Sequence, residues 1–256
     1  MNATSAQPLL QVHDLSVRFG AKEVVRNVSF EIAPGEKLAL VGESGSGKTI
    51  TALSLLRLAG DAVVQGRAVF EGRDLLALTE REMRGVRGGD IAMIFQEPMT
   101  ALNPLMTVGR QISEVLELKQ ALTQAQSWQA AIELIASTGI PEPERRAAAF
   151  PHQLSGGQRQ RAMIAMALAS RPKLLLADEP TTALDVTLRG QILELLADLQ
   201  RQTGMAVLLI THDLNLVRRF ADRVAVMEQG GLVEQGPVAA IFQAPQHAYT
   251  RRLIAS

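Results

Sequence analysis

The chain has 256 residues, enough for one large α/β domain or for a core domain with an inserted subdomain. Hydrophobic residues make up 47%, and 26 Lys and Arg residues balance 26 Asp and Glu residues, which argues against disorder and against a nucleic-acid surface made by bulk positive charge. The absence of cysteine excludes disulfides, thiolate metal sites and cysteine nucleophiles, and it fits a reducing compartment.

The N-terminal stretch of residues 1–15 has neither the basic nor the apolar region of a secretory signal, so we expect the mature chain to begin near Met1. The longest apolar runs, at 162–169 and 205–210, are far shorter than the ~18 to 20 residues that span a bilayer. Any work at a membrane is therefore expected to be that of a peripheral partner.

The first half of the chain opens with strand patterns. Apolar residues nearly alternate over 10–19 and over 28–32, and a turn follows at 33–36, which predicts an antiparallel opening. The run "KLALV" at 37–41 then ends directly in a glycine-rich loop, and 49–58 has helical spacing. The order strand, loop, helix is the one that a phosphate-binding loop requires.

The middle of the chain changes to helical periodicity. Val108, Ile112, Val115 and Leu116 share one helix face, and further apolar residues recur at helical spacing before the breakers at 139–143. We interpret this region as an inserted helical subdomain. An α/β rhythm resumes with strands predicted at 174–177, 206–210 and 224–228, a helix at about 187–202 and another after His212.

The segment "GESGSGKT" matches the full pattern G-x-x-x-x-G-K-[ST] between a predicted strand and a predicted helix. Its glycines let successive N–H groups face an anion, Lys48 reaches the β- and γ-phosphates, and the Thr49 hydroxyl can ligate Mg²⁺. We expect the whole loop to contact nucleotide: Gly42, Glu43, Ser44, Gly45, Ser46, Gly47, Lys48 and Thr49.

Two acidic residues end the apolar run of "KLLLADEP". Asp178 is placed to hold magnesium through its water shell, and Glu179, one residue further on, to orient or deprotonate the attacking water. The alternative is that the two carboxylates belong to a solvated turn without a catalytic role, and the presence of a complete phosphate loop argues against it.

A second glycine turn, "LSGGQRQR" at 154–161, lacks a lysine. Ser155 can cap the helix that follows, and Gly156 and Gly157 expose backbone N–H groups, so the turn can accept a γ-phosphate without a cation. The trailing "QRQR" is interpreted only as the polar first turn of that helix.

The motifs follow one another in the order found in ATP-binding cassette (ABC) ATPases, which the sequence resembles over nearly its whole length. The order is the lysine loop, Gln96 in "IFQEP", "LSGGQ", "LLLADEP", "ALD" at 183–185 and His212 in "ITHD". The resemblance implies an α/β P-loop NTPase fold with an antiparallel β subdomain. Its core would comprise about 1–96 and 156–256, and a helical subdomain associated with "LSGGQ" about 97–155.

The resemblance also implies roles for three further residues. Phe19 would stack on adenine, although a strand phenylalanine is also an ordinary core residue. Gln96 would contact metal and water and link the site to the helical subdomain, so that Thr49, Gln96 and Asp178 form the Mg²⁺ site. His212 would contact the γ-phosphate, the alternative being a capping or packing histidine.

In this family, two subunits pack head to tail around two ATP molecules. The second glycine turn would then bind ATP held by the other subunit through Ser155, Gly156, Gly157 and Gln158, with Asp185 near the seam. Closing such a dimer would couple the state of the nucleotide to the distance between subunits.

Two segments resemble the oligopeptide, dipeptide and nickel importer branch: "IFQEPMTALNPLMTVGRQI" at 94–112 and "HAYTRRLIAS" at 247–256. Ala248 replaces the proline usual in that branch, and the longer tail of many members is missing. The resemblance implies ATP-driven peptide import, with nickel as the alternative solute. Partners would be integral membrane permease subunits and, indirectly, an extracytoplasmic solute-binding protein, and the location the cytoplasmic face of the inner membrane.

Three other readings remain. The chain is also compatible with one half of a two-cassette polypeptide. A soluble cassette acting on nucleic acid or the ribosome usually has paired cassettes, long arms or basic linkers, and balanced charge argues against it, so we expect no nucleic-acid partner. A degenerate, non-hydrolysing cassette would lack Glu179, His212 or "SGGQ", and all three are present.

Overall fold

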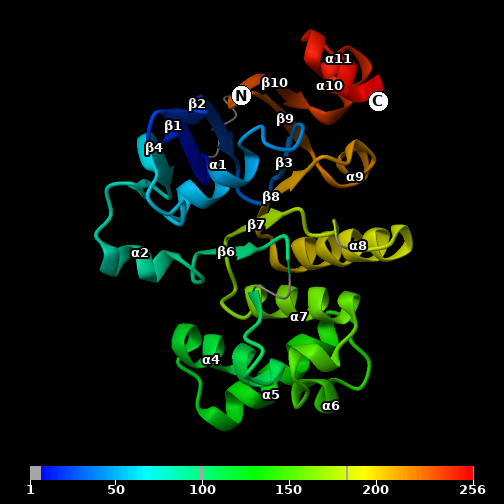
Figure 1. Ribbon diagram of the computed structural model, residues 1–256. Coiled ribbons are helices and arrows are strands. Elements are labelled where there is room, and N and C mark those ends of the chain that lie inside the picture. The colour runs from blue at the N-terminus through cyan, green and yellow to red at the C-terminus, as the bar shows by residue number, and fades with distance from the viewer. Residues whose placement is uncertain (1–6, 98–100, 183, 256) are drawn as a thin grey trace, which may run out of the picture. The chain divides into compact units, whose positions relative to one another are not determined.

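The computed structural model (Figure 1) describes residues 7–97, 101–182 and 184–255. The chain divides into two units, one formed by residues 1–83 and 204–256 and the other by residues 84–203. The division falls inside helix α2 (Glu80–Val86). Parts of two predicted motifs, residues 98–100 of the segment after Gln96 and Ala183 of "ALD", lie outside the described residues.

The first unit begins with a four-stranded antiparallel sheet in the order β2-β1-β4-β5. Along β1, Leu10 and Val12 are buried, and the next buried residue is Leu15 because the register shifts between Val12 and Leu15. Asp14 lies in this irregularity with φ +47°. The antiparallel opening is confirmed, and the bulge explains why its alternation is imperfect. The strands are β1 (Leu10–Phe19), β2 (Lys22–Ile32), β4 (Val63–Phe70) and β5 (Arg73–Asp74).

The same unit contains strands in the order β10-β9-β3-β8. β3 (Lys37–Val41) runs parallel to β8 (Ala206–Thr211) and β9 (Arg223–Glu228), and β10 (Gly231–Pro237) is antiparallel to β9. β3 and β8 are almost continuously buried, as expected of parallel strands covered on both faces. The helices of this unit are α1 (Lys48–Leu55), α9 (Leu214–Phe220), α10 (Val238–Gln243) and α11 (Ala248–Ala255).

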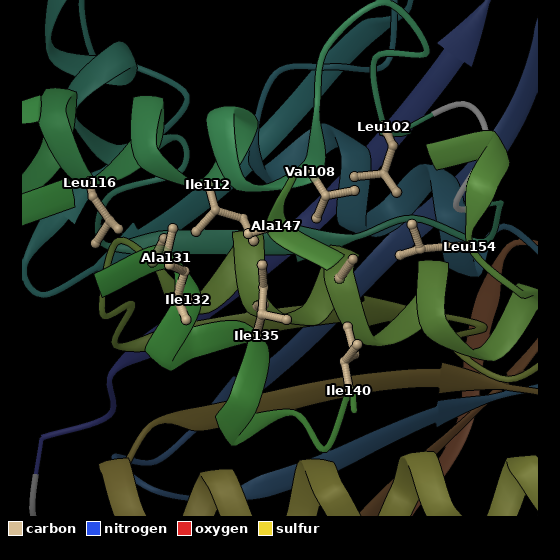
Figure 2. Close-up of a cluster of buried hydrophobic side chains, with 13 residues drawn as sticks. Leu102, Val108, Ile112, Leu116, Ala131, Ile132, Ile135, Ile140, Ala147 and Leu154 are labelled. Carbon is tan, nitrogen blue, oxygen red and sulfur yellow. The ribbon is translucent and has the colours of Figure 1, made fainter. Parts of the chain in front are cut away.

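The second unit combines two buried parallel strands, β6 (Ile91–Ile94) and β7 (Leu174–Asp178), with helices. The helices α4, α5, α6 and α7 pack around one apolar cluster, drawn in Figure 2, which includes the predicted face residues Val108, Ile112 and Leu116. The inserted helical region predicted from periodicity is therefore confirmed as helical. Its helices are α4 (Val108–Gln120), α5 (Gln124–Ser137), α6 (Pro143–Ala147) and α7 (Gly156–Leu168), and α8 (Val186–Thr203) follows β7.

Helix α1 differs from the predicted range of 49–58. It begins one residue earlier, after Gly47 in a left-handed conformation, and ends at Leu55. Arg57 has φ +54°, which an α-helix does not tolerate, so Leu58 lies beyond the helix and is exposed. Among the described residues, no helix combines the length and the apolar character needed to cross a bilayer.

Candidate nucleotide site

The glycine loop at 42–49 lies between β3 and α1, as predicted. A side chain at Gly42 would collide with the carbonyl oxygen of Met227 in β9. At Gly47 (φ +102°), a Cβ atom would come within 2.7 Å of the Val24 carbonyl oxygen. Glycine is thus required at both positions, because the loop lies directly against the backbone of neighbouring strands.

Lys48 is held by its own loop. Its ammonium donates hydrogen bonds to the carbonyl oxygens of Gly42 (2.8 Å) and Glu43 (2.9 Å), and the residue is only 5% exposed. At the other end of the loop, the Ser46 carbonyl oxygen accepts the N–H of Gly230 (3.0 Å). The loop therefore holds a buried cation in a fixed position, as expected of a phosphate-binding loop.

Two further predicted residues of the first unit lie at strand ends. Phe19 is the last residue of β1 and is half-buried. His212 follows β8 and is exposed, and it lines a pocket of about 240 Å³ together with Arg218 and Phe242. The cap of α9 is Asp213, whose Oδ1 accepts the N–H groups of residues 215 and 216. His212 is therefore not the capping residue of that helix.

In the second unit, the structure brings Gln96 and Glu179 together. β6 and β7 are parallel neighbours, so the residues after their carboxyl ends meet at one edge. The Gln96 side-chain amide donates to Glu179 Oε2 (3.2 Å), and the Thr182 hydroxyl donates to the same oxygen (2.7 Å). Asp178 ends β7 and is 3% exposed. The motifs shared with ABC ATPases predicted that Gln96 and Glu179 belong to one site. They did not predict Thr182.

Glu179 also has an unusual backbone conformation, with φ +43°. Residues other than glycine, asparagine and aspartate rarely adopt this left-handed region, although the exposed Glu71 and Glu142 of this chain do so as well. The turn redirects the chain immediately after the buried strand, and Glu179, unlike Asp178, is only half-buried.

The second glycine turn has the predicted cap. Ser155 Oγ accepts the N–H of Gln158 (3.3 Å), and the Gln158 side chain accepts the N–H of Ser155 (3.1 Å), which completes a capping box at the start of α7. The two glycines differ. Gly156 is exposed, whereas Gly157 is buried, and a Cβ atom there would lie 3.3 Å from Leu188 of α8.

The arginines of "QRQR" have structural partners. Arg159 Nε donates to the Pro151 carbonyl oxygen (2.7 Å), and Arg161 donates to the Thr138 carbonyl oxygen at the end of α5 (2.6 Å). They tie the first turns of α7 to the preceding helices. Asp185 likewise has a local role, because its Oδ1 accepts the Leu188 N–H (2.9 Å) at the start of α8.

Comparison with known proteins decides the family. The profile of the ABC transporter family matches residues 25–182, more than half of the chain. The chain belongs to the ABC transporter family. A solved dimeric cassette in a post-hydrolysis state, bound to ADP and Pi, superposes on this cassette with a TM-score of 0.79 at 29% identity, covering 90% of this chain and 98% of that one.

Curated relatives of this cassette are transport ATP-binding proteins. The peptidoglycan transport ATP-binding protein YejF of Agrobacterium fabrum is 60% identical over 100% of this chain and 48% of its own length. The oligopeptide transport ATP-binding protein OppD of Bacillus subtilis is 51% identical over 97% of this chain and 71% of its own length. The cassette thus spans about half the length of the first relative and a larger part of the second.

The predicted magnesium ligands are of the chemical kind that Mg²⁺ prefers, which is hard oxygen donors. In the second unit Asp178 offers a carboxylate and Gln96 an amide oxygen, and in the first unit Thr49 offers a hydroxyl. Within the described part of the chain, no group of three or more His, Asp or Glu side chains is placed to hold a metal ion. Mg²⁺ keeps several water ligands, binds substrate phosphates and is commonly held by only one or two carboxylates.

Proposed function

We propose that this cassette hydrolyses ATP with the residues predicted from its sequence. Lys48 and the loop at 42–49 would bind the phosphates, and bound Mg²⁺ would neutralise charge on them. Glu179 would orient a water whose oxygen attacks the γ-phosphorus. The bond to the β-phosphate oxygen then breaks, Glu179 accepts a proton from the water, and ADP and phosphate leave.

One observation carries this proposal most strongly. The Glu179 carboxylate follows a buried strand, in a left-handed turn, and two side chains donate to its Oε2. A left-handed turn and two donors on one oxygen also occur at the exposed Glu142, so what distinguishes Glu179 is its position directly after a buried strand, where the Gln96 side chain meets it. The two donors orient the carboxylate, which the proposed role of Glu179 in positioning the attacking water requires.

For the working assembly we propose a head-to-tail dimer in which the second glycine turn binds nucleotide held by the partner. The exposed Gly156, the capped helix start and the absence of lysine from 154–161 favour a site completed from another chain. A solved relative is described as a dimeric cassette bound to ADP and Pi, which supports this assembly. The partner is a second copy or a second cassette of a longer polypeptide.

The transport task we propose is import of peptides, with nickel as the alternative. The names of the relatives at 60%, 51% and 48% identity refer to peptidoglycan, oligopeptide and dipeptide transport. Membrane permease subunits would supply the pathway and a solute-binding protein would deliver the solute. The cassette would work peripherally at the cytoplasmic face of the inner membrane.

The first test measures ATP binding and ATP hydrolysis by the purified chain and by two variants. Lys48→Ala removes the cation of the loop, and Lys22→Ala is the control at an exposed lysine. We expect calorimetry to show loss of ATP binding for Lys48→Ala alone, because the phosphates lose a buried cation. Wild-type affinity in Lys48→Ala would contradict the phosphate role of the loop. Absence of turnover in the wild type, with its permease present, would favour a non-hydrolysing cassette.

The second test identifies the solute. Detergent-solubilised membranes containing the tagged cassette are expected to yield permease subunits and a solute-binding protein. Cells that lack the cassette are then compared for uptake of labelled peptides and of radioactive nickel. Restoration of peptide uptake by the wild type, and not by Glu179→Gln, supports the proposal; restoration of nickel uptake alone overturns it in favour of the alternative solute.

A further inference from the structure

The C-terminal helix α11 reaches the phosphate loop through one hydrogen bond. The Tyr249 hydroxyl accepts the backbone N–H of Glu43 (2.9 Å), a residue 206 positions away in the sequence. Tyr249 itself is 3% exposed and belongs to an apolar cluster with Val41 of β3 and Val226 of β9. A segment noted in the sequence only for its likeness to an importer branch thus contacts the loop expected to bind phosphate.

Glu43 is held on both sides of its α-carbon. Its N–H donates to Tyr249, and its carbonyl oxygen accepts the Lys48 ammonium (2.9 Å). A displacement of the peptide that precedes Glu43 would therefore move an acceptor of the phosphate-binding cation. The other end of the loop has its own support, because Ser46 accepts the N–H of Gly230.

Helix α11 is anchored independently of the loop. At its start, the Glu234 carboxylate of β10 accepts the N–H groups of Gln246 (2.8 Å) and His247 (3.0 Å). The Tyr249 N–H donates to His247 Nδ1 (3.2 Å), and Arg252 pairs with Glu228 of β9 (3.2 Å). The hydroxyl is thus presented to the loop by a fixed helix.

We propose that Tyr249 is a positioning residue of the phosphate site. Its hydroxyl fixes the Glu43 backbone, which in turn holds the Lys48 ammonium where phosphate binds. The inference rests on the proposed phosphate role of the loop. Tyr249 acts before the nucleotide arrives: a loop that is already ordered loses less conformational freedom on binding, and the nucleotide binds more tightly.

The test is Tyr249→Phe, which keeps the buried ring and removes only the hydroxyl. Calorimetry with AMP-PNP and Mg²⁺ is expected to show affinity weakened about 3- to 10-fold, the range for loss of one net hydrogen bond. The turnover rate at saturating ATP should change less than the affinity, because the bound nucleotide orders the loop again. Thermal unfolding measures any accompanying loss of stability.

Ile241→Val is the matched control, since Ile241 of α10 lies in the same apolar cluster as Tyr249. It is expected to lower the melting temperature by about 2 to 4 °C without changing nucleotide affinity. Equal affinity losses in the two variants would reduce Tyr249 to a packing residue and overturn the proposal.

Lys48→Ala separates this inference from the function on which it rests. If Lys48→Ala loses ATP binding while Tyr249→Phe binds as tightly as the wild type, the phosphate site stands and the role of Tyr249 is overturned. If Lys48→Ala binds normally, the loop is not the phosphate site and both proposals fail.

Discussion

Glu179 differs from an ordinary surface glutamate by its position directly after a buried strand, where the side chains of Gln96 and Thr182 donate to one of its carboxylate oxygens. We predict that Glu179→Gln lowers the rate of phosphate release about 10²- to 10⁴-fold, the usual contribution of a general base. Binding of ATP should be nearly unchanged, because the substitution is isosteric and leaves the phosphate loop intact. Phosphate-release kinetics and calorimetry measure the two effects.

The matched control is Glu133→Gln, which neutralises an exposed glutamate of α5. It is expected to behave like the wild type in both assays. Wild-type turnover in Glu179→Gln would exclude Glu179 as the base. Thr182→Val removes one of the two donors and should cost only a few-fold in rate, consistent with a residue that orients the carboxylate.

At the scale of elements, the capping box of α7 tests whether Ser155 has a second task. Ser155→Ala should destabilise the protein by about 1 kcal/mol, the usual cost of a lost N-cap. Ser155→Asp keeps a cap and suits the helix dipole, so stability should persist, but its charge should repel a γ-phosphate and prevent ATP-driven dimerisation. Urea unfolding and light scattering with ATP measure these effects.

Helix α5 supplies the control, because Thr123 and Gln126 form another capping box in the same unit. Thr123→Ala should lose a similar stability and dimerise normally. Normal dimerisation of Ser155→Asp would show that the second glycine turn only caps its helix.

Glu234 of β10 makes the stability of the protein depend on pH, because its carboxylate accepts N–H groups at the start of α11. Burial raises the pKa of this carboxyl, but the N–H groups of Gln246 and His247, which donate to its two oxygens, lower the pKa by more, so that it lies below the ordinary value of 4.5. A lowered pKa in the folded state contributes stability that is fully present above the unfolded pKa and is lost as the pH falls through the folded pKa.

We therefore predict that Glu234→Gln is less stable than the wild type at pH 7. The difference should stay constant down to the ordinary pKa of 4.5 and shrink at lower pH. Urea unfolding of both proteins across this range checks the sign. A difference that grows on acidification would contradict the hydrogen-bonded role of the carboxylate.

Local sequence patterns predicted some of the helices and strands and missed others. The strand at 37–41 was predicted from a short apolar run and the helix face around Val108 from periodicity, and both signals depend only on neighbours along the chain. β4 escaped notice because half of its residues are exposed and Gln65, Gly66 and Arg67 interrupt its apolar pattern, and β6 because its four residues are too short a signal. The Tyr249–Glu43 bond joins residues 206 apart, and no local pattern encodes such a contact.

At the scale of the whole molecule, the unit of function is proposed to be a pair of cassettes, and mixing two inactive chains tests this directly. Lys48→Ala removes the cation of the phosphate loop, and Ser155→Arg blocks the second glycine turn. In a head-to-tail pair of one chain of each kind, one composite site combines both damaged elements. The other combines an intact loop with an intact turn.

The mixed sample should therefore regain nucleotide trapping and ATP-driven dimerisation that neither variant shows alone. The level of trapping should be no more than half that of the wild type, because a mixed pair has one intact site where a wild-type pair has two. The readouts are retention of labelled nucleotide after rapid gel filtration and light scattering with ATP. Mixing Lys48→Ala with the unblocked Thr123→Ala chain controls for simple dilution by an active partner. No recovery in the first mixture, with recovery in the control, would mean that the second glycine turn is not completed in trans.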